Sequence, residues 1–313
     1  MTTLLLILLL ALALIAAAAW LFTVRTVRKV EAFLPPQGRF VEVPGARLHI
    51  VEKGEGRPLL LIHGLAGVLN HFTYGMVDEL AKHYRVIAVD RPGSGYSVRG
   101  AGASANLFDQ ADVMAALIDN LKLDRPVVVG HSLGGAVSLA LAQRHPQKVA
   151  ALALIAPLTH KPARISPAFD GLKIPSNWLR HALAWTLAVP VGLIKRDEIL
   201  AIVFGPEPVL EDFGTQGGGL LGVRPSHFIA ACADMNSELA QLLDMEKRYP
   251  AMQLPVGVFF GRGDLILDYR EQGEALASKV PGAELLLVDG GHMLPLTMVQ
   301  KSADFVRGVV ARA

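Results

Sequence analysis

The sequence contains only one cysteine among its 313 residues, Cys232. One thiol cannot form an internal disulfide, and without other cysteines nearby it lacks the usual partners of a structural zinc site. Folds stabilised by disulfides or by zinc are therefore excluded. We expect Cys232 to be a small buried hydrophobic residue.

The chain also lacks a strong charge of either sign. It has 30 basic and 28 acidic side chains, with a formal net charge of +2. Outside one basic cluster, which comprises Arg25, Arg28 and Lys29, it has no run of basic residues. Proteins that bind nucleic acid usually carry a basic stripe or patch. We therefore expect no nucleic-acid partner.

The first 24 residues contain no charged side chain, and Leu4 to Phe22 is almost entirely Leu, Ile and Ala. A helix of this length spans the roughly 30 Å hydrocarbon core of a bilayer. Trp20 suits the headgroup level, and the basic cluster follows it directly. The pattern predicts a single transmembrane anchor over residues 1–24, in the inner (cytoplasmic) membrane.

Two other interpretations of this segment stay open. A cleaved signal peptide usually begins with Lys or Arg, which Met-Thr-Thr lacks, although Ala16 to Ala19 could be a cleavage site. A buried core helix is the second alternative, but such a helix is rarely apolar on all sides over this length. The basic cluster favours a cytoplasmic position for the residues that follow.

After an expected juxtamembrane linker over residues 25–38, the pattern is that of one domain over 39–313. A hairpin is predicted over 40–53, with its turn at Pro44-Gly45. Continuous apolar runs, typical of buried parallel strands, then alternate with helical stretches. This alternation predicts an α/β fold, with a mostly parallel sheet covered by helices on both faces. The runs are 59–63, 86–90, 127–130, 152–156, 256–260 and 284–288, and the helices are 108–121, 134–144, 269–279 and 296–310.

The alternation is interrupted between Pro157 and Pro250, where no buried strand is evident. Apolar helical pieces occur around 178–194 and 228–245. An insertion this long is more typical of a helical cap than of a loop. A cap over the carboxyl edge of the sheet should place some of its apolar residues along a substrate pocket, although at helical spacing each one is more often part of the cap core. The residues concerned are Leu179, Leu183, Trp185, Leu187, Leu193, Ile194, Ile199, Leu220, Leu221, Phe228, Leu242 and Leu243.

A possible nucleophile lies in Gly130-His131-Ser132-Leu133-Gly134, which matches G-x-S-x-G between a predicted strand and a predicted helix. Glycines two residues before and after the serine relieve crowding at a strained turn. A serine hydroxyl needs a base to take its proton and an acid to orient that base. A carboxylate and a histidine are therefore expected later in the chain, in the order Ser, acid, His.

His292 follows the last predicted strand, and Asp264 follows the strand at 256–260. Ends of parallel strands commonly carry such groups. Asp268 would enter the next helix, where a carboxylate is expected in the first turn, and Asp289 is too close to His292 along the chain. We predict a catalytic triad of Ser132, Asp264 and His292.

An oxyanion formed during acyl transfer needs preorganised N–H donors. We expect these from the backbone of Leu133, directly after the serine, and of Leu65, in the loop that begins His63-Gly64. His63 is expected to tie loops together rather than to act in catalysis. This chemistry requires no metal and no organic cofactor.

Five segments together resemble the α/β-hydrolase superfamily: Ile62-His63-Gly64, residues 90–97 (DRPGSGYS), residues 130–135 (GHSLGG), residues 261–264 (GRGD) and residues 291–295 (GHMLP). The resemblance extends from about residue 40 to the C-terminus. Esterases, lipases, haloperoxidase-like enzymes and C–C bond hydrolases share these motifs. Epoxide hydrolases and haloalkane dehalogenases of the superfamily use an aspartate nucleophile, so Ser132 argues against both.

A narrower resemblance covers the whole chain. The apolar N-terminal helix, GGGLLGVRPSHF (217–228) and FFGRGD (259–264) are similar to the membrane-anchored bacterial phospholipases A. This resemblance implies a phospholipid or lysophospholipid substrate, dimerisation through the anchor region and a periplasmic catalytic domain. The alternatives are a generic carboxylesterase for short to medium-chain esters and a catalytically silent binding module.

Overall fold

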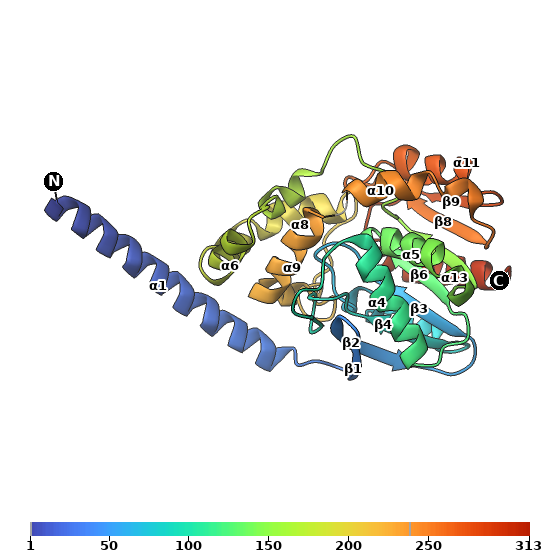
Figure 1. Cartoon of the computed structure of the whole chain (residues 1–313), viewed down its shortest axis with the longest axis horizontal. Helices are drawn as coiled ribbons and strands as arrows, with labels where there is room; N and C mark the ends of the chain where they lie inside the picture. The colour runs from blue at the N-terminus through green and yellow to red at the C-terminus, as the bar shows by residue number, and fades with distance from the viewer. Residues whose placement is uncertain (1, 238) are drawn as a thin grey trace.

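The computed structural model describes residues 2–237 and 239–313 and comprises a long N-terminal helix, an α/β domain and a cap. Helix α1 (Thr2–Phe33) projects away from the domain, and the cap helices lie between α1 and the sheet (Figure 1). The C-terminus lies at the far side of the α/β domain. The predicted α/β architecture with one preceding apolar helix is confirmed.

The described strands form one nine-stranded sheet with the order β1-β2-β4-β3-β6-β7-β8-β9, and β5 pairs with β2. The predicted hairpin is present as β1 and β2, which pair antiparallel from Arg39 opposite Ile50 to Val43 opposite Ala46. The strands from β4 to β9 along this order are parallel. Their bounds are β1 Arg39–Val43, β2 Ala46–Lys53, β3 Pro58–Ile62, β4 Arg85–Val89, β5 Val98–Arg99, β6 Val127–His131, β7 Ala151–Ile155, β8 Val256–Gly261 and β9 Glu284–Val288.

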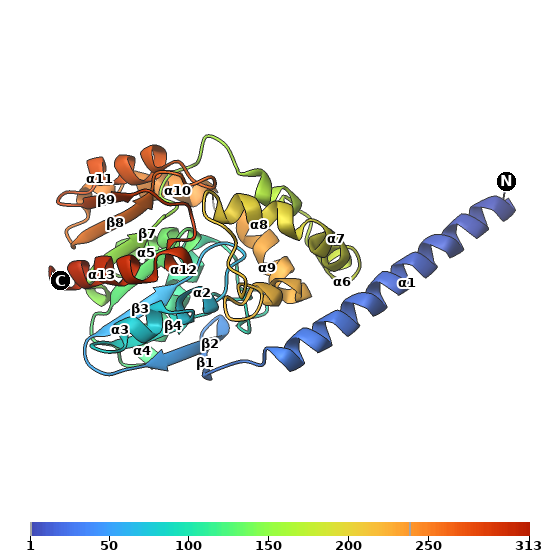
Figure 2. The ribbon, with the colours of Figure 1, turned by 180° about the vertical axis from the view of Figure 1, so that it is seen from behind.

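Helices cover both faces of this sheet, as Figures 1 and 2 show from opposite sides. Strand β3 shows why, because alternate side chains enter different apolar clusters. Leu60 and Ile62 pack in the cluster that contains α4 and α5, whereas Leu59 and Leu61 pack with α3 and α13. All four side chains are fully buried, so each contributes about 1.5–3 kcal/mol of hydrophobic stabilisation. The helices of the domain are α2 Asn70–Thr73, α3 Met76–Leu80, α4 Leu107–Asn120, α5 Leu133–Arg144, α11 Ala275–Lys279, α12 Leu294–Thr297 and α13 Val299–Val310.

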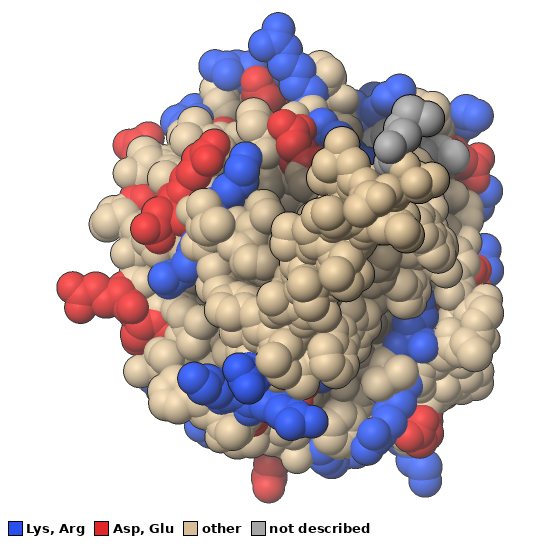
Figure 3. All heavy atoms as spheres, turned by 90° about the vertical axis from the view of Figure 1, so that its left-hand side faces the viewer, with Lys and Arg blue, Asp and Glu red and all other residues tan. Residues whose placement is uncertain are grey.

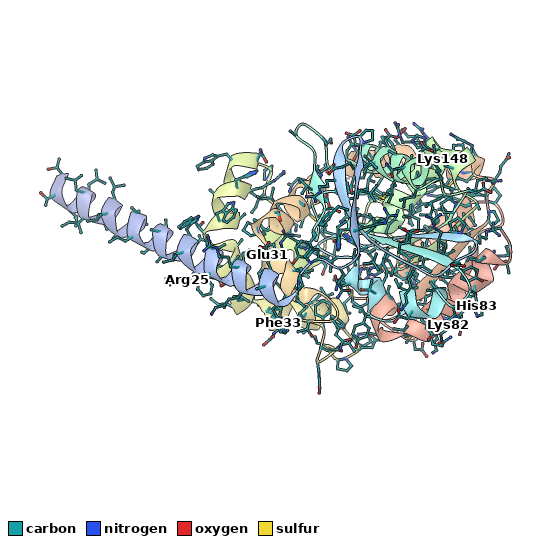
Figure 4. The ribbon with its side chains drawn as sticks, turned by 90° about the horizontal axis from the view of Figure 1, so that it is seen from below. Arg25, Glu31, Phe33, Lys82, His83 and Lys148 are labelled. Carbon is teal, nitrogen blue, oxygen red and sulfur yellow. The ribbon has the colours of Figure 1, made fainter. Side chains whose placement is uncertain are left out.

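Helix α1 extends into the segment expected to be a linker, residues 25–38. Helix α1 does not end at residue 24 but continues to Phe33, so residues 25–33 of the expected linker are helical. The reason is a tertiary contact: Val30 packs with Val68 and Leu221, and Glu31 forms an ion pair with Arg224 at 2.8 Å. Figure 4 shows Glu31 and Phe33 at the end of α1 that meets the domain.

The segment between β7 and β8 contains helices and no strand in its described residues, as predicted for the cap. Helix α9 is joined to the domain by a buried ion cluster. Asp234 on α9 accepts hydrogen bonds from Arg91 at 2.7 Å and from Arg99 at 2.6 Å. Helix α10 packs on the domain core instead, through Leu242 and Met245. The helices of this segment are α6 Asn177–Trp185, α7 Ala188–Ile194, α8 Arg196–Phe204, α9 Pro225–Met235 and α10 Leu239–Glu246.

Candidate active site

Ser132 lies on the sharp turn between β6 and α5, with φ +54° and ψ −121°. This region is strained for a residue with a side chain. Surrounding hydrogen bonds maintain it: the Ser132 amide donates to Ile155 O at 3.1 Å, and its carbonyl accepts from the amides of Gly135 and Leu158. The turn presents the side chain at the carboxyl end of the central strand.

The glycines of the motif are required by space as well as by backbone strain. A Cβ on Gly134 would lie 2.0 Å from Ile62 O, and one on Gly130 would lie 2.6 Å from Gly134 O. On the facing loop, a Cβ on Gly64 would lie 2.8 Å from the Cβ of Ser132. Any side chain at these positions would therefore displace the serine or the loop above it.

The structure brings His292 and Asp264 together. Nδ1 of His292 lies 2.7 Å from Oδ2 of Asp264, and both side chains are buried. The other carboxylate oxygen of Asp264 accepts from the amides of Ile266 and Leu267 at 2.7 and 2.9 Å, which fixes its orientation. With its Nδ1–H donated to Asp264, His292 has Nε2 free to accept a proton.

Asp268 and Asp289, which the sequence argued against as the acid of the triad, lie in different environments from Asp264. Asp268 is half-exposed and accepts from the amide of Arg270 at 2.8 Å, at the start of the following helical turn. Asp289 is fully exposed and points to Arg262. A second buried His–Asp pair joins His49 on β2 to Asp90, directly after β4, and Asp90 also accepts from the amide of Leu69.

The two amides expected to bind an oxyanion are both unengaged. Within the described residues, neither the Leu65 nor the Leu133 N–H donates to a protein acceptor. Leu133 is the first residue of α5, where backbone N–H groups have no partner inside the helix. Both residues line the same pocket as Ser132. Within the described residues, the Ser132 hydroxyl forms no hydrogen bond with His292. In structures without substrate, the distance between a nucleophile and its base is often too long for a hydrogen bond.

His63 has the supporting position that the sequence suggested. Its Nε2 accepts from the Arg91 amide at 2.9 Å, and Nδ1–H donates to Gly64 O at 2.8 Å. Burial, reinforced by the Arg91 charge, lowers the pKa of His63 well below its ordinary value. The Arg91 guanidinium itself donates to the carbonyls of His63 and Gly64, so it holds the loop that carries Leu65.

The pocket at Ser132 is lined mainly by apolar side chains. None of the twelve cap residues named as candidates is among the residues that line it. Leu193, Ile199, Leu220 and Phe228 line a separate cavity inside the cap, because α7 and α8 pack against η3 (Gly219–Val223) and α9. The apolar lining at Ser132 comes from residues near the ends of the cap segment and from the two loops: Leu65, Leu133, Leu158, Ile165, Phe169, Met235, Ile266 and Leu267.

Cys232 is fully buried on α9, and burial raises its thiol pKa to about 11, so it is a poor nucleophile. Residues 2–237 and 239–313 contain no group of three His, Cys, Asp or Glu side chains placed to hold a metal ion. The chemistry available at the site is that of a serine, an oriented histidine and two free amides, which together can support nucleophilic acyl transfer.

Comparison with known proteins agrees with this geometry. A family model described as alpha/beta hydrolase fold matches residues 57–297. The 2-hydroxymuconate semialdehyde hydrolase of Pseudomonas sp. (strain CF600) is 41% identical over 123 residues, which cover 39% of this chain and 44% of that protein. The chain therefore matches less than half the length of this curated relative.

Two solved structures are similar over most of the chain. An esterase from Thermogutta terrifontis has a TM-score of 0.70 at 23% identity and covers 88% of this chain and 98% of its own. A membrane phospholipase A described as a bacterial virulence factor has a TM-score of 0.64 at 26% identity and covers 99% of both chains. Because the family match spans most of the chain and includes the serine turn, the protein belongs to the alpha/beta hydrolase fold family.

Proposed function

We propose that this protein is a membrane-anchored serine ester hydrolase that releases fatty acids from glycerophospholipids or lysophospholipids. In the proposed reaction His292 accepts the proton of Ser132 as its Oγ attacks the ester carbonyl. The amides of Leu65 and Leu133 bind the oxyanion, and Asp264 orients and stabilises the His292 cation. The alcohol leaves with the proton from His292, and water then hydrolyses the acyl-enzyme by the same route.

The observation that carries the lipid substrate is the arrangement of α1 and the cap. Residues 2–18 of α1 are all exposed, and their side chains are apolar apart from two threonines. The helix contacts the cap at Thr23, whose hydroxyl donates to Thr186 O between α6 and α7 at 3.5 Å. A bilayer that surrounds the exposed part of α1 would therefore begin at the level of α6 and α7.

The cap presents apolar side chains at this level. Trp178 and Ile194 are 75% and 83% exposed, in an area that also contains Leu179, Trp185, Leu187, Val191 and Leu193. Figure 3 views the molecule from this side: the uncharged centre includes α1, which projects toward the viewer, Lys and Arg side chains lie below it, and acidic and basic side chains both lie above and beside it. Apolar residues next to basic ones suit the interface of an anionic membrane. Figure 4 places Arg25 where α1 leaves the domain.

The similarity to a membrane phospholipase A supports the same function, since it extends over 99% of both chains and therefore includes α1. The pocket beside Ser132 is apolar, as an acyl chain requires. Each CH₂ buried there would contribute up to about 0.8 kcal/mol of binding free energy, so longer acyl chains should be favoured until the pocket is filled.

A panel of phospholipids and lysophospholipids tests this proposal. Detergent-solubilised full-length protein should release free fatty acid from at least one glycerophospholipid or lysophospholipid and should also cleave p-nitrophenyl butyrate. Ser132→Ala is the matched control and should do neither. Ester cleavage without fatty acid release from any lipid would leave a generic carboxylesterase. No labelling by a fluorophosphonate would instead indicate a catalytically silent binding module.

A further inference from the structure

A short cap segment directly after α8, Gly205 to Glu207, contacts both loops of the candidate acid and base. Against the acid loop, a Cβ on Gly263 would lie 3.1 Å from the Pro206 ring, and one on Gly205 would lie 2.6 Å from the Leu265 side chain. Gly263 and Leu265 are the two neighbours of Asp264 in the chain. The cap segment therefore packs on either side of the acid.

The same segment holds the base loop through a carboxylate. The amide of Gly291, directly before His292, donates to Glu207 at 3.1 Å from Oε1 and 2.9 Å from Oε2. A Cβ on Gly291 would lie 2.3 Å from Gly205 O, so only glycine permits this approach. On the other side of His292, Met293 shares an apolar cluster with Phe204, the last residue of α8.

The two loops are also joined to each other. The Gly263 amide donates to Gly290 O at 2.9 Å, and the Arg262 amide donates to Val288 O at 2.8 Å. A displacement of Gly290-Gly291 would therefore reach the acid loop as well as His292. Within residues 2–237 and 239–313, Glu207 supplies the one contact in this network from a charged side chain of the cap.

Glu207 is oriented toward the backbone and not toward a cation. Among the described residues, its carboxylate forms no ion pair with a Lys, Arg or His side chain, and its side-chain hydrogen bonds are those from the Gly291 amide. A hydrogen bond to an ionised acceptor is roughly twice as strong as a neutral one. The half-buried carboxylate is therefore well suited to fix one peptide unit.

We propose that Glu207 is a positioning residue, which holds Gly291 and thereby the imidazole of His292 in the orientation that ester hydrolysis needs. Because Glu207 belongs to the cap, the orientation of His292 then depends on the position of the cap relative to the α/β domain. This inference rests on serine ester hydrolysis within the proposed function, and it is independent of the lipid substrate.

The test uses full-length protein, p-nitrophenyl butyrate and a fluorophosphonate. In Glu207→Ala the Gly291 peptide is released, and a displacement near 1 Å at a reacting group can cost about 100-fold in rate. We expect kcat to fall by roughly 10- to 100-fold with KM nearly unchanged. The rate of fluorophosphonate labelling should fall by the same factor, because it also depends on His292.

Two variants separate positioning from a general structural role. Glu207→Gln keeps an oxygen acceptor for the Gly291 amide and should recover most of the lost kcat. Glu211→Ala removes an exposed carboxylate four residues further along the cap and should behave as the wild type. Glu207→Asp keeps the charge but withdraws the carboxylate by one methylene, so it should lose kcat even if the alanine variant does not fold.

If Glu207→Ala or Glu207→Asp has the same kcat and the same labelling rate as the wild type, the proposal is overturned. An equal loss in Glu207→Ala and Glu207→Gln, accompanied by a lower melting temperature, would also overturn it, since the residue would then serve folding alone. A wild-type protein that is not labelled would contradict serine hydrolysis itself. Labelling of the wild type and of every Glu207 variant at one rate would contradict only the role of Glu207.

Discussion

The ring of His131, directly before the candidate nucleophile, lies beside the ring of His292, with 5.0 Å between their centroids. Nε2–H of His131 donates to the backbone oxygen of His292 at 3.0 Å. Burial, followed by the charge of His292, lowers the pKa of His131 well below its ordinary value. His131 is therefore neutral near pH 7 and supports His292 without opposing its positive charge.

His131→Ala should reduce both activity and stability. The substitution leaves the buried carbonyl of His292 without its donor, which costs about 1–3 kcal/mol in the free energy of unfolding. We expect kcat to fall and KM to change little, because the base loses one of its supports. Urea denaturation and p-nitrophenyl butyrate kinetics measure the two effects. A variant with wild-type kcat would contradict this role for His131.

Ser132→Ala should lower kcat by roughly 10⁶-fold without unfolding the protein, because members of a triad act as a unit. His292→Ala should be about as damaging. Asp264→Asn should cost on the order of 10⁴-fold, since the amide favours the wrong tautomer of His292. Asp268→Asn is the matched control, because Asp268 contacts only the start of its own helical turn. A larger loss of kcat in Asp268→Asn than in Asp264→Asn would refute the choice of Asp264 as the acid.

Asp234→Ala should strongly destabilise the junction between the cap and the domain. It leaves the Arg91 guanidinium fully buried without its carboxylate partner. Breaking a buried ion pair on one side costs about 3–5 kcal/mol. Asp244→Ala removes an exposed pair with Arg248 and should cost about 0–1 kcal/mol. Guanidinium denaturation compares the two variants, and similar losses would contradict the structural role assigned to Asp234.

Deletion of residues 2–24 should release a soluble protein that still reacts with fluorophosphonates, because the docking contacts of Val30 and Glu31 remain. Deletion of residues 2–36 should in addition lower the melting temperature, since it exposes Val68 and Leu221. The full chain should stay with membranes after a carbonate wash, because a spanning helix is not held by charge. A mature N-terminus near Ala19 in mass spectrometry would indicate a cleaved signal peptide instead.

Stability should fall as the pH falls from about 6.5 toward 3. Burial lowers the pKa of His71 to about 3 from an ordinary value of 6.5, so in this window the unfolded chain binds a proton that the folded chain does not. At pH 5 this group alone should cost about 2 kcal/mol. Burial lowers the pKa of His63 and His227 in the same direction. Urea midpoints at pH 7.5 and pH 5 measure the effect, which His71→Asn should reduce. Equal midpoints in the wild type would contradict it.

Much of the fold follows from patterns that are local in the sequence. Strand β3 is apolar at every position because both faces of the sheet are covered, and that is visible in Leu59 to Ile62 without any structure. The turn at Ser132 is equally local, since Gly130 and Gly134 supply the space that its strained backbone needs. The order of serine, acid and base along the chain led to Asp264 and His292 because each follows a buried strand.

Contacts between distant segments were decided by the tertiary structure alone. The end of α1 could not be placed from the sequence, because residues 25–33 stay helical through packing with Val68 and Leu221. The lining of the pocket could not be assigned from the sequence for a similar reason. Amphipathic cap helices reveal that they have an apolar face, but not whether it meets the pocket or, as for Leu193 and Phe228, another cap helix.

The supports of the candidate base belong to this second group. His131 lies 161 positions from the carbonyl it holds, and Glu207 lies 84 positions from the Gly291 amide. Neither distance leaves a periodicity or motif in the sequence, because a hydrogen bond across the fold depends only on where two segments meet. The sequence by itself determined which groups could carry out the chemistry, whereas the tertiary structure decided which other residues hold them in place.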